Sequence, residues 1–118
     1  MAARLLAVVV GLALSGPAHA QDAARGAQLY EARCGGCHSA DANRIGPRHA
    51  GILGRRAGSL PDFNYSPALA RATLVWSADT LERWLADPKR LIPGQRMNVR
   101  VADAQDRRDL VAYLAMLK

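Results

Sequence analysis

Two cysteines, three positions apart and followed at once by a histidine, constrain this chain more than any other feature of its sequence. Residues 33–40 read RCGGCHSA, and Cys34 and Cys37 are the only cysteines among the 118 residues. Three kinds of site use such spacing: a zinc site, a dithiol redox centre, and the attachment point of a covalently bound haem. The rest of the sequence has to decide among them.

A zinc site is disfavoured by the shortage of ligands. Structural zinc needs four ligands in a tetrahedron, and Cys34, Cys37 and the adjacent His38 cannot easily all reach one ion. After residue 20 the only other histidine is His49, and there is no second cysteine pair. A thioredoxin-type dithiol would follow a strand of a βαβ unit, whereas this motif ends a predicted helix.

The order C-x-x-C-H is typical of c-type haem attachment. One helical turn brings Cys34 and Cys37 to the two porphyrin vinyl groups, with which they form thioether bonds, and carries His38 under the iron. Met97 is the only methionine after residue 20 in a predicted loop, and its thioether is a soft ligand suited to iron. We expect one haem c, with iron bound by His38 and Met97; apolar packing is the alternative role for Met97.

The first 20 residues have the pattern of a secretory signal peptide. Arg4 gives a positive start, residues 5–14 (LLAVVVGLAL) form an apolar run, and an A-H-A cleavage pattern ends at Ala20. The run is too short to span a bilayer, which needs about 20 apolar residues. We therefore expect export to the periplasm, no membrane anchor after cleavage, and one domain at residues 21–118.

Helix-start signals and apolar spacing predict an all-α fold with no strand of useful length. Asp22, Ser66, Ser77 and Asp103 are the N-cap candidates. The predicted helices extend from these caps to about Arg33, to about Ala72, to the stop at Pro88, and to the C-terminal end.

Two features indicate that the domain encloses something other than protein. Residues 39–62 lose all periodicity, and a structureless stretch of that length is unusual in a small domain. The chain also has few large aromatics for a core, with two Trp, three Tyr and one Phe, and small domains often need a cofactor. Gly26, inside the first helix, costs about 1 kcal/mol relative to Ala and indicates close approach by another backbone.

With these residues in hand, the chain resembles the class I c-type cytochromes, the soluble carriers of bacteria and mitochondria. The resemblance implies the cytochrome c fold, with three to five helices wrapped round one covalently bound haem and the N- and C-terminal helices crossing. The matching pieces, in the family's order, are Gly26 with Tyr30, Cys34–His38, Gly46-Pro47, Gly51, Gly54-Arg55, Phe63–Ser66, Trp76, Trp84-Leu85, Asp87–Arg90, Ile92–Gly94, Met97 and Leu110–Leu114.

The resemblance also assigns roles around the haem. His38 Nε2 would bind the iron while its Nδ1–H donates to the carbonyl of Pro47, which fixes the tautomer. Arg55, Tyr65 and Trp76 would hydrogen-bond or pair with the haem propionates, which are costly charges below a surface.

Two residues depart from the family's pattern. Trp84 stands where mitochondrial relatives have a tyrosine near the methionine sulfur, and it is expected to contact the haem. Leu69 stands where they have an asparagine in the short helix over the haem. Both changes alter polar contacts near the iron.

These features predict a single-electron carrier rather than an enzyme. The resemblance implies a periplasmic monomer that shuttles between a quinol-oxidising membrane complex and a terminal oxidase, or serves a periplasmic dehydrogenase. Two alternatives stay open: a haem c subunit of a dehydrogenase complex, and a small haem peroxidase or gas-binding protein with an open iron position. Nucleic-acid binding could also explain the net charge of +6, but export and haem disfavour it.

Basic residues flank the segments expected to rim the haem edge. They are either scattered solubilising charge or a positive docking face for acidic partners, which raises encounter rates at low salt. The residues are Arg33, Arg44, Lys89, Arg90 and Arg96.

Overall fold

The computed structural model describes Gly11 and residues 21–118, so the predicted signal peptide lies, apart from Gly11, outside the described residues. The described part is helical, with a single antiparallel bridge between Arg56 and Val75 and no strand, which confirms the all-α prediction. Its helices are α1 (Ala23–Arg33), α2 (Pro67–Ala70), α3 (Ala78–Ala86), α4 (Pro88–Leu91) and α5 (Ala104–Met116).

All four predicted N-caps are confirmed by side chains that accept a hydrogen bond from the first helical turn. Asp22 accepts from Arg25 N–H at 2.9 Å and Ser77 from Thr80 N–H at 3.1 Å. Ser66 and Asp103 do the same for α2 and α5. Each cap satisfies one of the N–H groups that a helix start leaves without a partner inside the helix.

Two helix boundaries differ from the prediction. The helix α2 ends at Ala70 rather than near Ala72, because the Ala72 N–H turns back to the Leu69 carbonyl at 3.1 Å. The helix α4 was not predicted: Pro88 ends α3 but is also the first residue of α4, with Asp87 as its N-cap. Proline suits that position because it has no N–H to leave unpaired.

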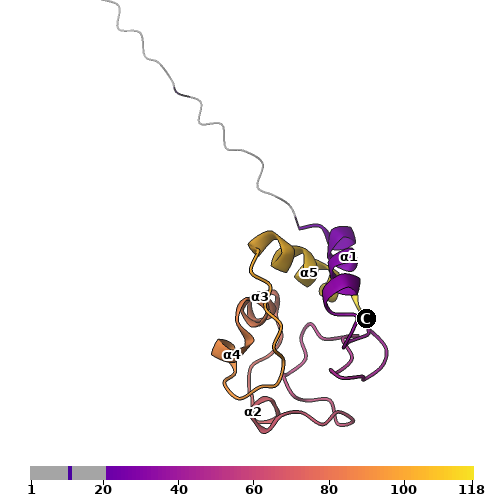
Figure 1. Cartoon of the computed structure of the whole chain (residues 1–118), viewed down its shortest axis with the longest axis vertical. Helices are drawn as coiled ribbons and strands as arrows, with labels where there is room; N and C mark the ends of the chain where they lie inside the picture. Colours follow the sequence, from indigo (N-terminus) through magenta and orange to yellow (C-terminus); the bar gives the residue numbers. More distant parts are fainter. Residues whose placement is uncertain (1–10, 12–20) are drawn as a thin grey trace, which may run out of the picture.

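The helices α1 and α5 cross and pack against each other at one end of the molecule, and α2 lies at the other end (Figure 1). Gly26 is buried at the crossing, where an added Cβ would overlap the backbone carbonyl oxygen of Asp109 and come within 2.9 Å of Tyr113 Cβ. The expected close approach of a second backbone is therefore confirmed.

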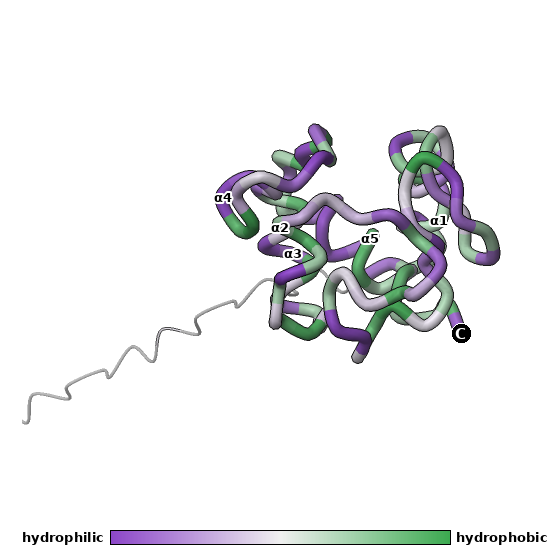
Figure 2. The backbone as a smooth tube through the Cα atoms, turned by 90° about the horizontal axis from the view of Figure 1, so that it is seen from below, coloured by the Kyte–Doolittle hydropathy of each residue, from purple (hydrophilic) through white to green (hydrophobic). Residues whose placement is uncertain are grey.

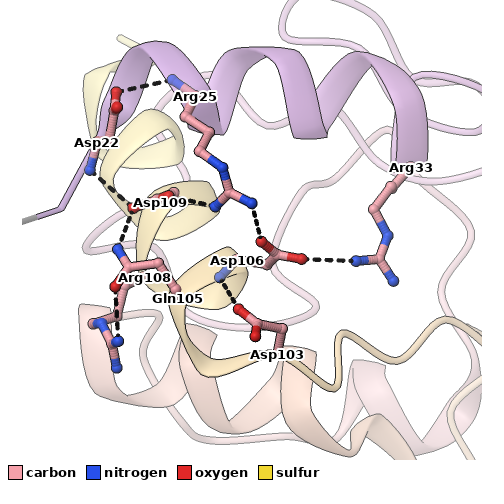
Figure 3. Close-up of polar contacts among 8 residues, drawn as sticks. All are labelled: Asp22, Arg25, Arg33, Asp103, Gln105, Asp106, Arg108 and Asp109. Carbon is pink, nitrogen blue, oxygen red and sulfur yellow. Dashed lines mark hydrogen bonds and ion pairs between the residues drawn. The ribbon is translucent and has the colours of Figure 1, made fainter. Parts of the chain in front are cut away.

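A polar cluster joins the same two helices (Figure 3). The carboxylate of Asp109, which is only 1% exposed, accepts hydrogen bonds from the Asp22 N–H at 2.9 Å, Arg25 at 2.7 Å and Gln105 at 2.8 Å. Arg25 also bonds to Asp106. Burial works to raise the pKa of Asp109, but these donors hold it below its usual value.

The loops that connect the helices carry apolar stretches as well as polar ones (Figure 2). Residues 39–62 contain no helix, as predicted. Ile52 and Ala57 from this loop join a buried core that also includes Leu81 of α3 and Leu110 of α5. Loop and helix residues thus share one buried core.

Gly26→Ala is expected to destabilise the protein. Overpacking costs about 1–3 kcal/mol, which outweighs the gain of about 1 kcal/mol in helix propensity, because α1 would have to move off the Asp109 carbonyl. Gly36→Ala is the matched control, since nothing lies within 4 Å of its added Cβ. Thermal melts check this: a lower Tm for Gly36→Ala than for Gly26→Ala would contradict the crossing geometry.

Asp109→Asn is expected to lower the free energy of unfolding at neutral pH, because the amide lacks the charge that pairs with Arg25. The folded-state pKa of Asp109 lies below its usual value of 3.8, so its contribution is present above that value and is lost as the pH falls through the folded-state pKa. Urea titrations across pH should show the gap between parent and variant closing in acid. A gap that widens in acid would contradict the assignment.

Candidate functional site

One cavity of about 440 Å³ lies between the loops and helices α1, α2, α3 and α5. Protein interiors contain few voids larger than a water molecule, whereas this volume falls in the range of ligand pockets. All nine predicted site residues line it, although they come from segments more than 60 positions apart: Cys34, Cys37, His38, Pro47, Arg55, Tyr65, Trp76, Trp84 and Met97.

The two cysteines sit on a single turn at the end of α1. Cys34 is the C-cap of α1, and its carbonyl accepts the N–H groups of Cys37 at 3.0 Å and His38 at 2.9 Å. Both thiols are free of disulfide bonds, and burial raises the pKa of Cys34. The turn thus presents two thiols and one imidazole to the same cavity.

Arg44 braces this turn from outside. Its guanidinium donates to the carbonyls of Gly35 at 2.5 Å and Gly36 at 3.3 Å. These carbonyls lie just past the C-terminal end of α1, where no helical N–H can pair with them. Arg44, one of the basic residues predicted for a docking face, therefore also has a local structural role.

The ring of His38 is held in one tautomer. Its Nδ1 lies 2.8 Å from the carbonyl oxygen of Pro47, which can only accept, so Nδ1 carries the proton and Nε2 keeps a lone pair. Burial lowers the pKa of His38, against the opposing effect of the bond to Pro47. An added Cβ on Gly46 would overlap this ring. The result is a neutral imidazole in a single tautomer, the form that binds metals.

Met97 lies in the loop between α4 and α5, half-buried against the core. A residue that the sequence analysis missed fixes its backbone. The Gln95 amide donates to the Met97 carbonyl at 2.7 Å and accepts from the Met97 N–H at 2.5 Å. Gln95 is 7% exposed; its only signal in the sequence is its place two residues before the methionine.

The far wall of the cavity combines aromatic rings with one cation. Trp76 and Trp84 are both buried and meet edge to face, with ring centroids 5.4 Å apart. The Arg55 guanidinium donates to the carbonyls of Ala50 at 3.1 Å and Arg48 at 2.8 Å. Burial lowers the pKa of Arg55.

Tyr65 and Leu69, the second residue that departs from the family's pattern, also line the cavity. The hydroxyl of Tyr65 accepts the Leu60 N–H at 3.2 Å, and Tyr65 acts electrostatically on Arg55 to oppose the effect of burial. Leu69, on α2, lines the cavity and packs against the core. This end of the cavity therefore brings a cation and a phenol close together.

A second pair of cavity residues had no predicted role here. The Tyr30 hydroxyl lies 2.9 Å from His49 Nδ1, and the His49 ring stacks on His38 with centroids 4.1 Å apart and planes 20° apart. Burial lowers the pKa of His49 to about 3. From the sequence, His49 was a candidate only for zinc binding. A lone histidine in a loop belongs to no periodic pattern that would predict its neighbours in the fold.

The donor set of the cavity fits a covalently bound haem. Two thiols on one turn, a neutral imidazole next to them and a thioether from the other half of the chain all border a mainly apolar space. A porphyrin needs such an apolar space, and its vinyl groups and iron need those sulfur and nitrogen atoms.

Comparison with known proteins agrees with this fit. The family model described as Cytochrome c matches residues 23–118. The chain belongs to the cytochrome c family. A cytochrome c2 of Rhodopseudomonas palustris is 42% identical over 115 residues, covering 83% of this chain and 100% of that protein. A cytochrome c of Euglena viridis is 40% identical over 100 residues, covering 82% of this chain and 98% of that protein.

Solved structures agree with the fold. Cytochrome cH from Methylobacterium extorquens superposes with a TM-score of 0.76 at 35% identity, covering 80% of this chain and 97% of that one. The predicted family and the cytochrome c fold are thereby confirmed. The chain is a haem-containing electron carrier rather than an enzyme, and its haem c is covalently bound; Cys34 and Cys37 fit the attachment motif.

The predicted basic residues are all exposed, but they divide into two groups. Arg33 and Arg96 line the cavity, and Arg44 braces the cysteine turn beside it. Lys89 and Arg90 lie on α4 and are not part of the cavity lining.

In the part of the chain that the structure describes, no helix has the length and apolar character to cross a membrane.

Proposed function

We propose that this cytochrome c is a diffusible periplasmic carrier of single electrons whose iron is bound by His38 and Met97. One observation carries the proposal: the cysteine turn with His38 and the Met97 loop, from opposite halves of the chain, border a single apolar cavity. The signal-peptide pattern of residues 1–20 supports export before the domain at 21–118 folds.

The proposed anchors hold the cofactor in two ways, through covalent bonds to the porphyrin and through ligation of the iron. Cys34 and Cys37 form the thioether bonds, and His38 binds iron through Nε2 because its Nδ1–H is committed to Pro47. When bound, the haem supplies an iron that alternates between two oxidation states and so takes up and releases one electron. A Met97 sulfur ligand favours the reduced state and raises the potential.

Gln95 supports the methionine end of this arrangement. Its amide bonds to both backbone groups of Met97, so the loop cannot rotate there without breaking two partly buried hydrogen bonds. A ligand held in place changes little when the iron changes charge, which suits electron transfer.

Arg55, Tyr65 and Trp76 are the proposed partners of the haem propionates. A buried carboxylate is costly unless it is paired and hydrogen-bonded. Arg55 still has donor groups beyond its two bonds to carbonyls, and Tyr65 and Trp76 border the same cavity. Trp84 supplies apolar contact near the proposed sulfur ligand.

The electron is expected to leave where the cavity reaches the surface. Ile45 and Val99 both line the cavity, yet they are 79% and 37% exposed. Arg33 and Arg96 also line the cavity, and Arg44 lies against the adjoining cysteine turn. Positive charge therefore lies beside this apolar rim, although Arg33 also pairs with Asp106 at 3.6 Å. An acidic face of a quinol-oxidising complex, a terminal oxidase or a periplasmic dehydrogenase would be attracted to it, most strongly at low salt.

Met97→Ala tests the ligand assignment. The haem should stay attached, while the weak red absorption band of sulfur-bound ferric iron disappears and the ferrous form gains rapid carbon monoxide binding. Met116→Ala is the matched control, because Met116 is 65% exposed on α5, and both properties should remain as in the parent. A Met97→Ala spectrum identical to the parent's would refute Met97 as a ligand.

A further inference from the structure

Two residues outside the set assigned above lie beside the proposed iron ligand: His49 stacks on it, and Tyr30 contacts His49. The His49 ring lies almost parallel to the His38 ring, with centroids 4.1 Å apart and planes 20° apart. The Tyr30 hydroxyl lies 2.9 Å from His49 Nδ1. The three side chains therefore form a continuous series from α1 to the imidazole that faces the iron position.

We propose that Tyr30 and His49 form a positioning pair that fixes the plane of the His38 imidazole, and with it the electronic state of the bound iron. The inference rests on the proposed role of His38 as an iron ligand. Neither Tyr30 nor His49 needs to touch the iron for this role.

The need for such a pair follows from how His38 is held. The hydrogen bond to Pro47 fixes the tautomer, but carbonyl oxygens accept N–H groups over a broad range of directions. That bond alone leaves the imidazole some freedom to turn about the line from Nε2 to the metal. A flat ring packed against its face removes this freedom, because turning His38 would drive its edge into His49.

His49 can only act this way if it is itself fixed, and Tyr30 provides that. Tyr30 is 3% exposed on the inner face of α1, and its ring also packs against Tyr113 of α5 with centroids 5.2 Å apart. A buried imidazole is costly without a hydrogen bond, which the Tyr30 hydroxyl supplies. The crossing of the terminal helices thus sets the position of His49.

The shape of His49 also suits this role, because its flat ring lies almost parallel to the His38 ring. An aliphatic side chain could fill the same space, but it would lack both the flat face and the hydrogen bond to Tyr30.

Proton NMR of the oxidised holoprotein tests the pair directly, because the shifts of the four haem methyl groups depend on the orientation of the axial imidazole plane. His49→Leu removes the stacking ring, and Tyr30→Phe removes only the hydroxyl that holds it. Both should redistribute the four methyl shifts, His49→Leu more strongly. The double variant should resemble His49→Leu alone, since both changes act through one ring.

Tyr113→Phe is the matched control. It removes a hydroxyl from the ring that neighbours Tyr30, and Tyr113 does not line the cavity, so the methyl shifts should stay as in the parent. Circular dichroism of each variant establishes that the helices are retained. If His49→Leu does not fold, Tyr30→Phe decides the question alone.

Parent-like methyl shifts in folded Tyr30→Phe and His49→Leu proteins would overturn the positioning role and leave the proposed ligands intact. A parent protein whose oxidised spectrum lacks the strongly shifted ring protons of a bound histidine would instead refute His38 as a ligand, and the positioning role with it. The two failures are therefore distinguishable.

Discussion

Burial of a porphyrin in one cavity is the interaction on which the rest of this structure depends. The cavity of about 440 Å³ borders Leu81, Leu85, Leu110 and Leu114, all of which also belong to the buried core. A domain of this size has too little apolar surface of its own to leave such a space unfilled. The haem c that the family binds covalently would therefore complete the core, and residues of the loop at 39–62 line the same cavity.

The crossing of α1 and α5 connects that core to the site. Gly26 allows the two backbones to touch, and the Asp109 carboxylate joins both helices through Arg25 and the Asp22 N–H. Arg33 is the last residue of α1, and Cys34 follows it as the C-cap. The cysteine turn therefore begins directly after the helix that the crossing holds in place. The contacts that stabilise the terminal helices therefore also position the cysteine turn.

Local sequence signals predicted much of this protein. The N-caps Asp22, Ser66, Ser77 and Asp103 are local in the chain, and each was found from its own neighbourhood. The C-x-x-C-H motif is local too, and the resemblance to class I cytochromes added the distant partners that border the same cavity. The caps and the motif depend on spacing along the chain, which can be read directly from the sequence.

The parts that were missed depend either on contacts that form only when the chain folds or on a residue that suits two local structures. His49 acquires its place only when the loop brings it against His38 and the crossing brings Tyr30 to it. Gln95 is an ordinary loop residue until the chain turns its amide back on Met97. The helix α4 was hidden because Pro88, read as a stop, serves equally well as a start.

The central claim is that the haem completes the core, and circular dichroism of the haem-free chain tests it most directly. Replacing both Cys34 and Cys37 with Ser removes the covalent anchors, and the protein is then freed of any residual haem. The haem-free chain should lose most of its helical signal and show no cooperative thermal transition, whereas the holoprotein shows both. Native helicity with a cooperative melt in the haem-free variant would contradict the account.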